Sequence, residues 1–157
     1  MKLSSRQDIE APAAFVFDAL NDFQAWERAA LRRGADVART DKMKAIAPGL
    51  SWLIKFAYRG KDRQLALRLT QLEHPSMMGF FGSGASLDGQ ADIDLMALAA
   101  RRTRMSVSVD VRPRTIGARL VLQSLRLAKT RINRRFAERV ALFCTEIEIR
   151  YRKSLGN

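Results

Sequence analysis

The side chains best suited to nucleophilic or metal chemistry occur once each in this sequence, as His74 and Cys144. A serine-histidine-aspartate arrangement would have to use His74, but no Gly-x-Ser-x-Gly motif accompanies it and the sequence places no acid beside it. His74 precedes Pro75, which favours a turn. Cys144 has no second cysteine or histidine nearby with which to hold a metal ion, so we expect an inert, buried or half-buried thiol. These residues predict no catalytic centre and no metal site.

Two aspartates offer a second kind of chemistry. Asp92 and Asp94 are two residues apart in an alternating segment, so they share one face of a strand and could act as a carboxylate pair in acid/base catalysis. Ile93 and Leu95 take the opposite, apolar face. We therefore interpret the aspartates as exposed to solvent, and we expect them to pair across strands with Arg104. The nearby Gly-x-Gly spacing lacks the lysine and the helix start of a phosphate-binding loop.

A third set of residues could bind a ligand instead of reacting with it. These are aromatic and large aliphatic residues, which either fill the core or line a cavity. A cavity-lining residue is a core residue that has no packing partner on the side facing the cavity. Tyr58 would be the polar handle, because a buried phenol needs a hydrogen-bond partner that a ligand can supply. The candidate ligand-binding residues are Trp52, Phe56, Tyr58, Leu67, Phe80, Phe81, Phe136, Val140 and Phe143.

The basic residues form a fourth set, because the net charge of +12 is concentrated near the C-terminus. Residues 112–157 carry 12 basic and 3 acidic side chains, which accounts for +9 of the total. Such a cluster attracts an anionic lipid surface or a nucleic acid, or it is simply a solvated helix face. Nucleic acid is disfavoured, since aromatic residues are not interleaved with the arginines. The candidate anion-binding residues are Arg119, Arg126, Lys129, Arg131 and Arg134.

Length and composition predict one folded domain over residues 1–157. A chain of 157 residues with 47% hydrophobic and 28% charged residues has the composition of an ordinary globular protein. One cysteine excludes an internal disulfide and fits a reducing cytoplasm. The N-terminus has no signal-peptide pattern, and the longest uncharged apolar stretch, Leu95 to Ala100, is too short to cross a bilayer. We expect a cytoplasmic protein without a cofactor.

The elements that must position these residues begin with a strand and two helices. Leu3–Glu10 alternates as a short strand, and Pro12 suits the first turn of the helix that follows. Apolar residues then recur at helical spacing over residues 15–23. A second short helix ends at Gly34, after a basic last turn.

The middle of the chain predicts an antiparallel meander of six strands. From about Asp36 to Val111 apolar and polar residues alternate, with turn signals between the runs. Arg59-Gly60-Lys61-Asp62 indicates a hairpin turn, and the glycine-rich residues 79–89 indicate a strand end that leads into a mobile loop. A sheet with one apolar face needs another element to cover that face.

The last segment supplies this cover. Apolar residues recur at steps of three or four from Val121 to Tyr151, which predicts one helix of roughly 35 residues. Most of the arginines fall on its opposite face. Arg139 falls close to the early part of the apolar stripe, so either the stripe drifts around the helix or the helix bends near Phe136.

The opening of the chain resembles a known family. Its motif is Ile9-Glu10-Ala11-Pro12, followed by Val16-Phe17, Leu20, Asp22-Phe23 and Trp26. This motif and the order of the elements resemble the START-like (SRPBCC) superfamily of polyketide cyclase/dehydrase-like proteins, lipid-transfer domains and plant pathogenesis-related proteins. The resemblance implies an α+β helix-grip fold, in which a curved antiparallel β-sheet wraps around a long C-terminal helix and two short helices follow the first strand. It also implies an apolar cavity between the sheet and that helix.

Three functions follow from these observations. The first is a cytoplasmic binder or carrier of an apolar small molecule or lipid, without catalysis. The second is a polyketide cyclase/dehydrase-like enzyme, which a polar residue facing the ligand would favour. The third is a membrane-surface or nucleic-acid module that uses the basic C-terminal helix, which one continuous basic patch would favour.

Overall fold

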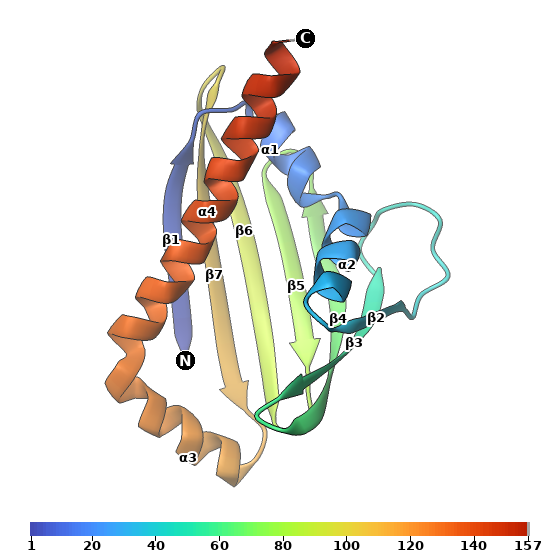
Figure 1. Ribbon diagram of the computed structural model, residues 1–157, viewed down its shortest axis with the longest axis vertical. Helices are drawn as coiled ribbons and strands as arrows, with labels where there is room; N and C mark the ends of the chain where they lie inside the picture. Colours follow the sequence, from blue (N-terminus) through green and yellow to red (C-terminus); the bar gives the residue numbers. More distant parts are fainter. Residues whose placement is uncertain (157) are drawn as a thin grey trace.

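Seven strands form one curved antiparallel sheet, and three of the helices, α1, α2 and α4, lie on one of its faces (Figure 1). The computed structural model describes residues 1–156. The strands are β1 (Lys2–Ile9), β2 (Asp36–Arg39), β3 (Ser51–Tyr58), β4 (Lys61–Glu73), β5 (Met77–Ser83), β6 (Leu87–Ala99) and β7 (Arg102–Pro113), in the spatial order β1-β7-β6-β5-β4-β3-β2. The helices are α1 (Ala13–Leu20), α2 (Phe23–Arg32), α3 (Ile116–Leu125), the 3₁₀ turn η1 (Arg126–Ala128) and α4 (Lys129–Leu155).

The first three elements form where the sequence predicts them. Pro12 precedes the first turn of α1 with φ −63°, which its ring fixes in advance. Asp22 begins α2, where its carboxylate accepts a hydrogen bond from the backbone N–H of Ala25 at 3.3 Å. The chain leaves α2 through Gly34, whose φ of +90° suits a residue without a Cβ.

The meander also follows the predicted order, and two of its turns are informative. β3 and β4 are joined through Arg59 and Gly60, which both have positive φ, as a two-residue hairpin loop requires. The glycine-rich segment is more regular than expected. Gly82 lies inside β5 and pairs with Gly89 of β6, so the connection between these strands is only residues 84–86.

The C-terminal segment is helical throughout, but it is not one straight helix. The turn η1 separates α3 from α4, so the bend lies at residues 126–128, and α4 continues through Phe136 without a break. Arg139 is exposed on α4. Figure 1 shows α4 crossing the concave face of the sheet, whereas α3 turns away beyond the end of β7.

Helix α4 also covers the free edge of β1. The Asn133 side-chain oxygen accepts a hydrogen bond from the backbone N–H of Ser4 at 3.0 Å. At the residue directly after the other end of β1, the Glu148 carboxylate accepts a hydrogen bond from the backbone N–H of Glu10 at 3.1 Å. These two bonds give partners to edge groups that the sheet itself leaves unpaired.

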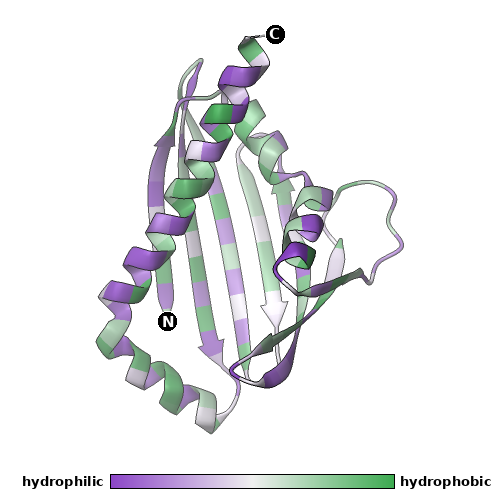
Figure 2. Ribbon diagram, in the orientation of Figure 1, coloured by the Kyte–Doolittle hydropathy of each residue, from purple (hydrophilic) through white to green (hydrophobic). Residues whose placement is uncertain are grey.

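The hydrophobic core lies where α1 and the C-terminal half of α4 meet the sheet. Phe17 of α1, Ile147 of α4 and Ile9 of β1 are buried there together with Met105 of β7. Thr103 is the buried polar residue in this region, and its hydroxyl donates a hydrogen bond to the carbonyl oxygen of Ala11 at 2.8 Å. Figure 2 shows apolar and polar residues alternating along the strands, and the burial of Leu69, Leu95 and Met105 confirms the predicted apolar face.

Candidate functional site

A pocket of about 350 Å³ opens beside this core, between α2 and the concave face of strands β2 to β6. We expected a cavity between the sheet and the C-terminal helix, but α2 and the last residue of α1 form the helical wall instead. Helix α4 packs along β1 at the other edge of the sheet, and α3 turns away beyond the end of β7. The lining residues are Leu20, Phe23, Trp26, Glu27, Ala30, Val37, Trp52, Ile54, Leu67, Met78, Phe80, Ala91 and Ile93.

The helical wall is one face of α2. Phe23, Trp26, Glu27 and Ala30 line the pocket, and their spacing of three, four and seven residues places them on the same side of a helix. Trp26 is held in place by a hydrogen bond from its indole N–H to the carbonyl oxygen of Leu20, at 3.0 Å. A short helix with one apolar face thus covers the part of the sheet that α4 leaves open.

The sheet wall follows from strand alternation and register. Phe80 of β5 lies between Leu69 of β4 and Ala91 of β6, and all three side chains point to the concave face. In the next row Leu67 pairs with Gly82, which in turn pairs with Gly89. The two adjacent glycines contribute no side chains to that row, and the leucines of β4 take the space above Gly82, where a Cβ would lie 3.2 Å from Leu65.

Aromatic contacts join the two walls. The ring of Phe23 meets the ring of Trp52 edge-on, with centroids 5.2 Å apart, and it meets Phe80 in the same way at 6.2 Å. Trp26 packs on Phe143 of α4, with ring centroids 5.1 Å apart. Such edge-to-face pairs fix ring orientation as well as burying area. The pocket therefore has a defined aromatic frame.

Glu27 is the one charged residue in the pocket wall. Its carboxylate oxygen Oε1 accepts a hydrogen bond from the indole N–H of Trp52 at 2.9 Å. One oxygen of the carboxylate is thereby fixed to the sheet, and the lining position of the side chain brings a hydrogen-bond acceptor to an otherwise apolar wall. Glu27 was not among the residues predicted from the sequence. Its position four residues after Phe23 and next to Trp26, on the apolar face of α2, was the available signal.

An ion pair supports the outer side of Trp52. The guanidinium of Arg39 lies 5.8 Å from the Trp52 ring centroid and donates two hydrogen bonds to the Asp41 carboxylate, at 2.6 and 2.7 Å. The backbone N–H groups of Met43 and Ser51 also donate to Asp41, each at 2.9 Å. Arg39 and then these backbone donors hold the pKa of Asp41 well below its usual range. The β2–β3 loop is tied to the pocket wall by a carboxylate that stays charged.

Three of the nine predicted ligand-binding residues line the pocket, and two more lie close to it. Trp52, Leu67 and Phe80 are in the wall. Phe143 contacts the pocket through Trp26, and Val140 packs half-buried against the core one turn before it.

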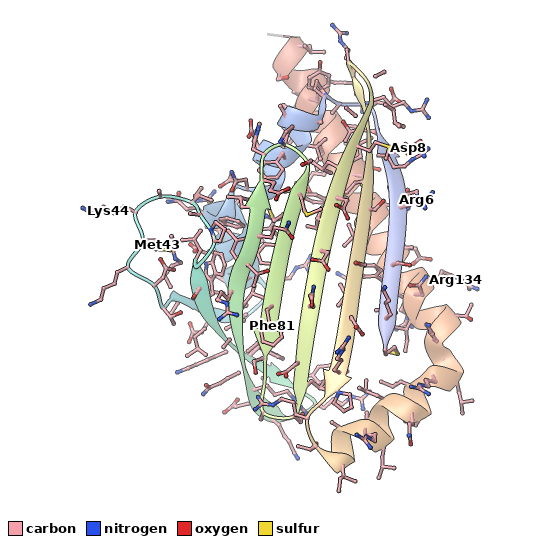
Figure 3. All side chains as sticks on the ribbon, turned by 180° about the vertical axis from the view of Figure 1, so that it is seen from behind. Arg6, Asp8, Met43, Lys44, Phe81 and Arg134 are labelled. Atoms are coloured by element: carbon pink, nitrogen blue, oxygen red, sulfur yellow. The ribbon has the colours of Figure 1, made fainter. Side chains whose placement is uncertain are left out.

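The other four are placed elsewhere, each for a physical reason. Phe81 follows Phe80 in β5, so it points to the outer face of the sheet, as Figure 3 shows. Phe56 lies in a separate, polar depression near the β3–β4 hairpin, and Phe136 is half-buried on α4 away from the pocket. Tyr58 is 53% exposed beside Arg59 and Arg63, so it is not the buried phenol that we expected.

The candidates for covalent chemistry lie outside the pocket lining. His74 does have an acid beside it, contrary to the sequence interpretation: its Nε2 is 3.4 Å from an oxygen of Asp18, and both side chains are largely exposed. Cys144 is buried in α4, where desolvation, followed by the charge of Glu148, raises the pKa of its thiol to about 11. A thiol of this kind is almost entirely protonated at neutral pH.

The aspartates and the basic residues lie on the surface. Asp92 and Asp94 are on the outer face of β6, but Arg104 does not pair with them. It lies directly opposite Asp8 of β1 and donates to that carboxylate at 2.9 Å, which lowers the pKa of Asp8. The five predicted anion-binding residues, Arg119, Arg126, Lys129, Arg131 and Arg134, are all exposed.

Residues 1–156 contain no group of three or more histidine, cysteine, aspartate or glutamate residues arranged to hold a metal ion. Within the same residues, none of the helices combines the length and the apolar character needed to cross a membrane.

Comparison with solved structures shows the fold. The Zhui aromatase/cyclase from Streptomyces sp. R1128 superimposes with a TM-score of 0.69 at 15% identity, over 96% of this chain and 94% of that one. A START superfamily protein from Mycobacterium smegmatis gives 0.57 at 12% identity, over 88% and 98%. A conserved protein from Geobacillus kaustophilus gives 0.58 at 12% identity, over 98% and 97%. No protein-family model and no curated protein sequence matches this chain. The chain therefore has the START-like helix-grip fold that the opening motif predicts.

Proposed function

We propose that this helix-grip domain binds an apolar small molecule or lipid in the pocket between α2 and the sheet, and that it carries this ligand chemically unchanged. The observation that carries the proposal is the wall itself, in which Glu27 is the single charged residue among aromatic and aliphatic neighbours. A volume of about 350 Å³ lies in the range of roughly 300–1,000 Å³ that is typical of small-molecule sites. Structures of the same fold include a START superfamily protein. We place the carrier in the cytoplasm, which suits its single cysteine.

The geometry also suggests what kind of ligand fits. The rings of Phe23, Trp52 and Phe80 offer faces and edges for a flat or branched hydrocarbon body. Glu27 offers an acceptor at the wall, so a ligand with one hydroxyl or N–H group at its end would be oriented by it. We therefore propose a mostly apolar ligand with a single hydrogen-bond donor.

A matched pair of substitutions tests the pocket. Ala91 and Gln90 are neighbours in β6 that point to opposite faces of the sheet, and Ala91 lines the pocket. Ala91→Phe should fill the pocket and weaken binding of an apolar fluorescent probe by at least about tenfold, or about 1.4 kcal/mol. Gln90→Phe adds the same side chain outside and should leave the affinity unchanged. A fatty acid, sterol or quinone should displace the probe from the wild-type protein.

Two results would contradict the carrier proposal. One is the absence of saturable binding of all these ligands to folded wild-type protein. The other is an equal loss of affinity in Ala91→Phe and Gln90→Phe, which would place the probe outside the pocket. Native mass spectrometry of protein purified from its host would identify the bound molecule directly.

The second candidate function is that of a cyclase-type enzyme, and Glu27 is the observation that favours it. A carboxylate in an apolar wall can accept or donate a proton, and a structure of the same fold is an aromatase/cyclase. The two functions differ in the fate of the ligand. A carrier returns it unchanged, whereas an enzyme converts it at a rate that Glu27→Gln should reduce while binding persists. Mass analysis of candidate polyketides after incubation distinguishes the two.

A further inference from the structure

Helix α3 and the turn η1 carry apolar side chains that lie in contact with solvent. Ile116, Leu120 and Leu127 are 81%, 60% and 96% exposed, and Val121 beside them is 58% exposed. Ile116 and Leu120 are four residues apart, and Leu127 follows two turns later, so these three side chains share one face. We call the four residues the apolar ridge. A helix that covers the core would bury such residues, but α3 lies beyond the end of the sheet (Figures 1 and 2).

The ridge is presented by a helix with a fixed start. Thr115 begins α3, and its hydroxyl oxygen accepts a hydrogen bond from the backbone N–H of Ala118 at 3.1 Å. The guanidinium of Arg114 donates to the carbonyl oxygen of Gly84 at 2.8 Å and to the hydroxyl of Ser83 at 3.0 Å. These bonds attach the start of α3 to the β5–β6 connection, and Leu122 is buried on the side of α3 away from the ridge.

Basic side chains flank the ridge. Arg119 of α3 and Arg126 of η1 are seven residues apart and lie on the side next to Ile116 and Leu120. Lys129, Arg131 and Arg134 continue the positive charge into α4. No acidic residue occurs in the sequence between Asp110 and Glu138. The ion pairs found within residues 1–156 involve other arginines, so these five cations face solvent without a carboxylate partner. Figure 3 shows Arg134 pointing away from the body of the molecule.

We propose that α3, η1 and the first turns of α4 dock on an anionic phospholipid membrane. The apolar ridge would enter the boundary between headgroups and acyl chains, while the flanking arginines and lysine would contact lipid phosphates. A second copy of this chain would bring the same positive charge and be repelled. A nucleic acid would attract the cations but leave the ridge in water. The combination of exposed leucines with unpaired cations thus fits a lipid surface best, and this proposal does not depend on the ligand of the pocket.

Vesicle binding tests the proposal with the full chain. Wild-type protein should co-sediment with phosphatidylcholine vesicles that contain phosphatidylserine, and not with phosphatidylcholine alone. Arg119→Glu with Arg126→Glu should lower the partition coefficient at least about 25-fold, at about fivefold for each cation lost. Leu120→Ser with Leu127→Ser should lower it by about tenfold or more, because exposed leucines lose their transfer into lipid. Both effects should be measured at low and at physiological salt, since only the charge effect is screened.

The controls use the opposite face of the sheet. Arg6, labelled in Figure 3, and Arg68, which pairs with the outward-pointing Phe81, are exposed there on β1 and β4. Arg6→Glu with Arg68→Glu therefore changes the net charge equally and should alter binding less than about twofold. The indole that Leu127→Trp introduces should emit at shorter wavelength when the protein binds anionic vesicles, because the ring then leaves water. The proposal is overturned by the absence of binding to anionic vesicles at low salt, by an equal loss in the control variant, or by binding that depends on the arginines but not on the leucines. The last result would assign the surface to a nucleic acid or another polyanion.

Discussion

The two ends of the C-terminal helical segment follow one sequence pattern and reach opposite environments. Ile147 near its end is completely buried, whereas Val121 near its start is 58% exposed, although both belong to the same run of apolar residues at steps of three or four. The difference lies in what stands opposite them. The end of α4 meets α1 and the sheet, but α3 lies past the last strand. Periodicity identifies the apolar face of a helix, and the rest of the fold decides whether that face has a partner.

Replacing one apolar side chain at each end by alanine tests whether the two ends differ in packing. We expect this pair of variants to give the largest effect on stability. Ile147→Ala should lower the free energy of unfolding by about 2–5 kcal/mol, because it leaves a cavity in a fully packed site. Val121→Ala should change it by less than about 0.5 kcal/mol. Urea titration of both variants measures the difference. Similar losses in the two would mean that α3 packs against the protein in solution.

The sequence predicted the order of elements well because each element carries a local signal. Alternation marks the strands, Pro12 and Gly34 mark the limits of the first helices, and the pair Arg59-Gly60 marks a hairpin. The break at η1 carried no such signal, since neither glycine nor proline occurs there. A stripe of apolar residues runs across the break, so the pattern favoured a single helix.

The candidate site was harder to predict for a reason of topology. Residue type and alternation led to Trp52, Leu67 and Phe80, which line the pocket, and alternation applied strictly would have excluded Phe81, which follows Phe80. Glu27 could not be found in this way. Its role depends on α2 lying against β3, a contact between residues 25 positions apart that no local pattern encodes.

The junction between the two ends provides a finer test. Asn133 is where α4 first reaches β1, and its side chain accepts from the backbone N–H of Ser4. Asn133→Ala should lower the free energy of unfolding by about 1 kcal/mol, a typical value for one hydrogen bond. Hydrogen exchange should become faster at the Ser4 amide and remain slow at Met105 in the core. The neighbouring Arg134→Ala is the control and should be neutral, so an equal effect of both would contradict a specific role for the Asn133 bond.

Acid should have the smallest effect, and it should act on the pocket wall and not on the packed end of α4. Apolar contacts hold that end of the helix, whereas the Asp41 carboxylate supports the wall from the β2–β3 loop. The pKa of Asp41 is lowered in the folded protein, so its contribution is complete above the unfolded value of about 4 and is lost as the pH falls toward the lower folded value. The amide signals of Met43 and Ser51 should therefore stay constant through pH 4 and change only in stronger acid. A titration midpoint near 4 would show that the Arg39 pair does not form.

The two edge strands of the sheet affect how readily copies of this protein aggregate at high concentration. A strand with free backbone groups along its side is a template on which another molecule can add its own strand, and this is the usual start of aggregation. Here one margin, β1, is occupied by the side chains of Asn133 and Glu148, and the other, β2, is only four residues long. The helix that closes the core therefore also blocks strand addition. Detachment of α4 from the sheet would expose the edge of β1, on which a fibril could grow, together with the hydrophobic interior.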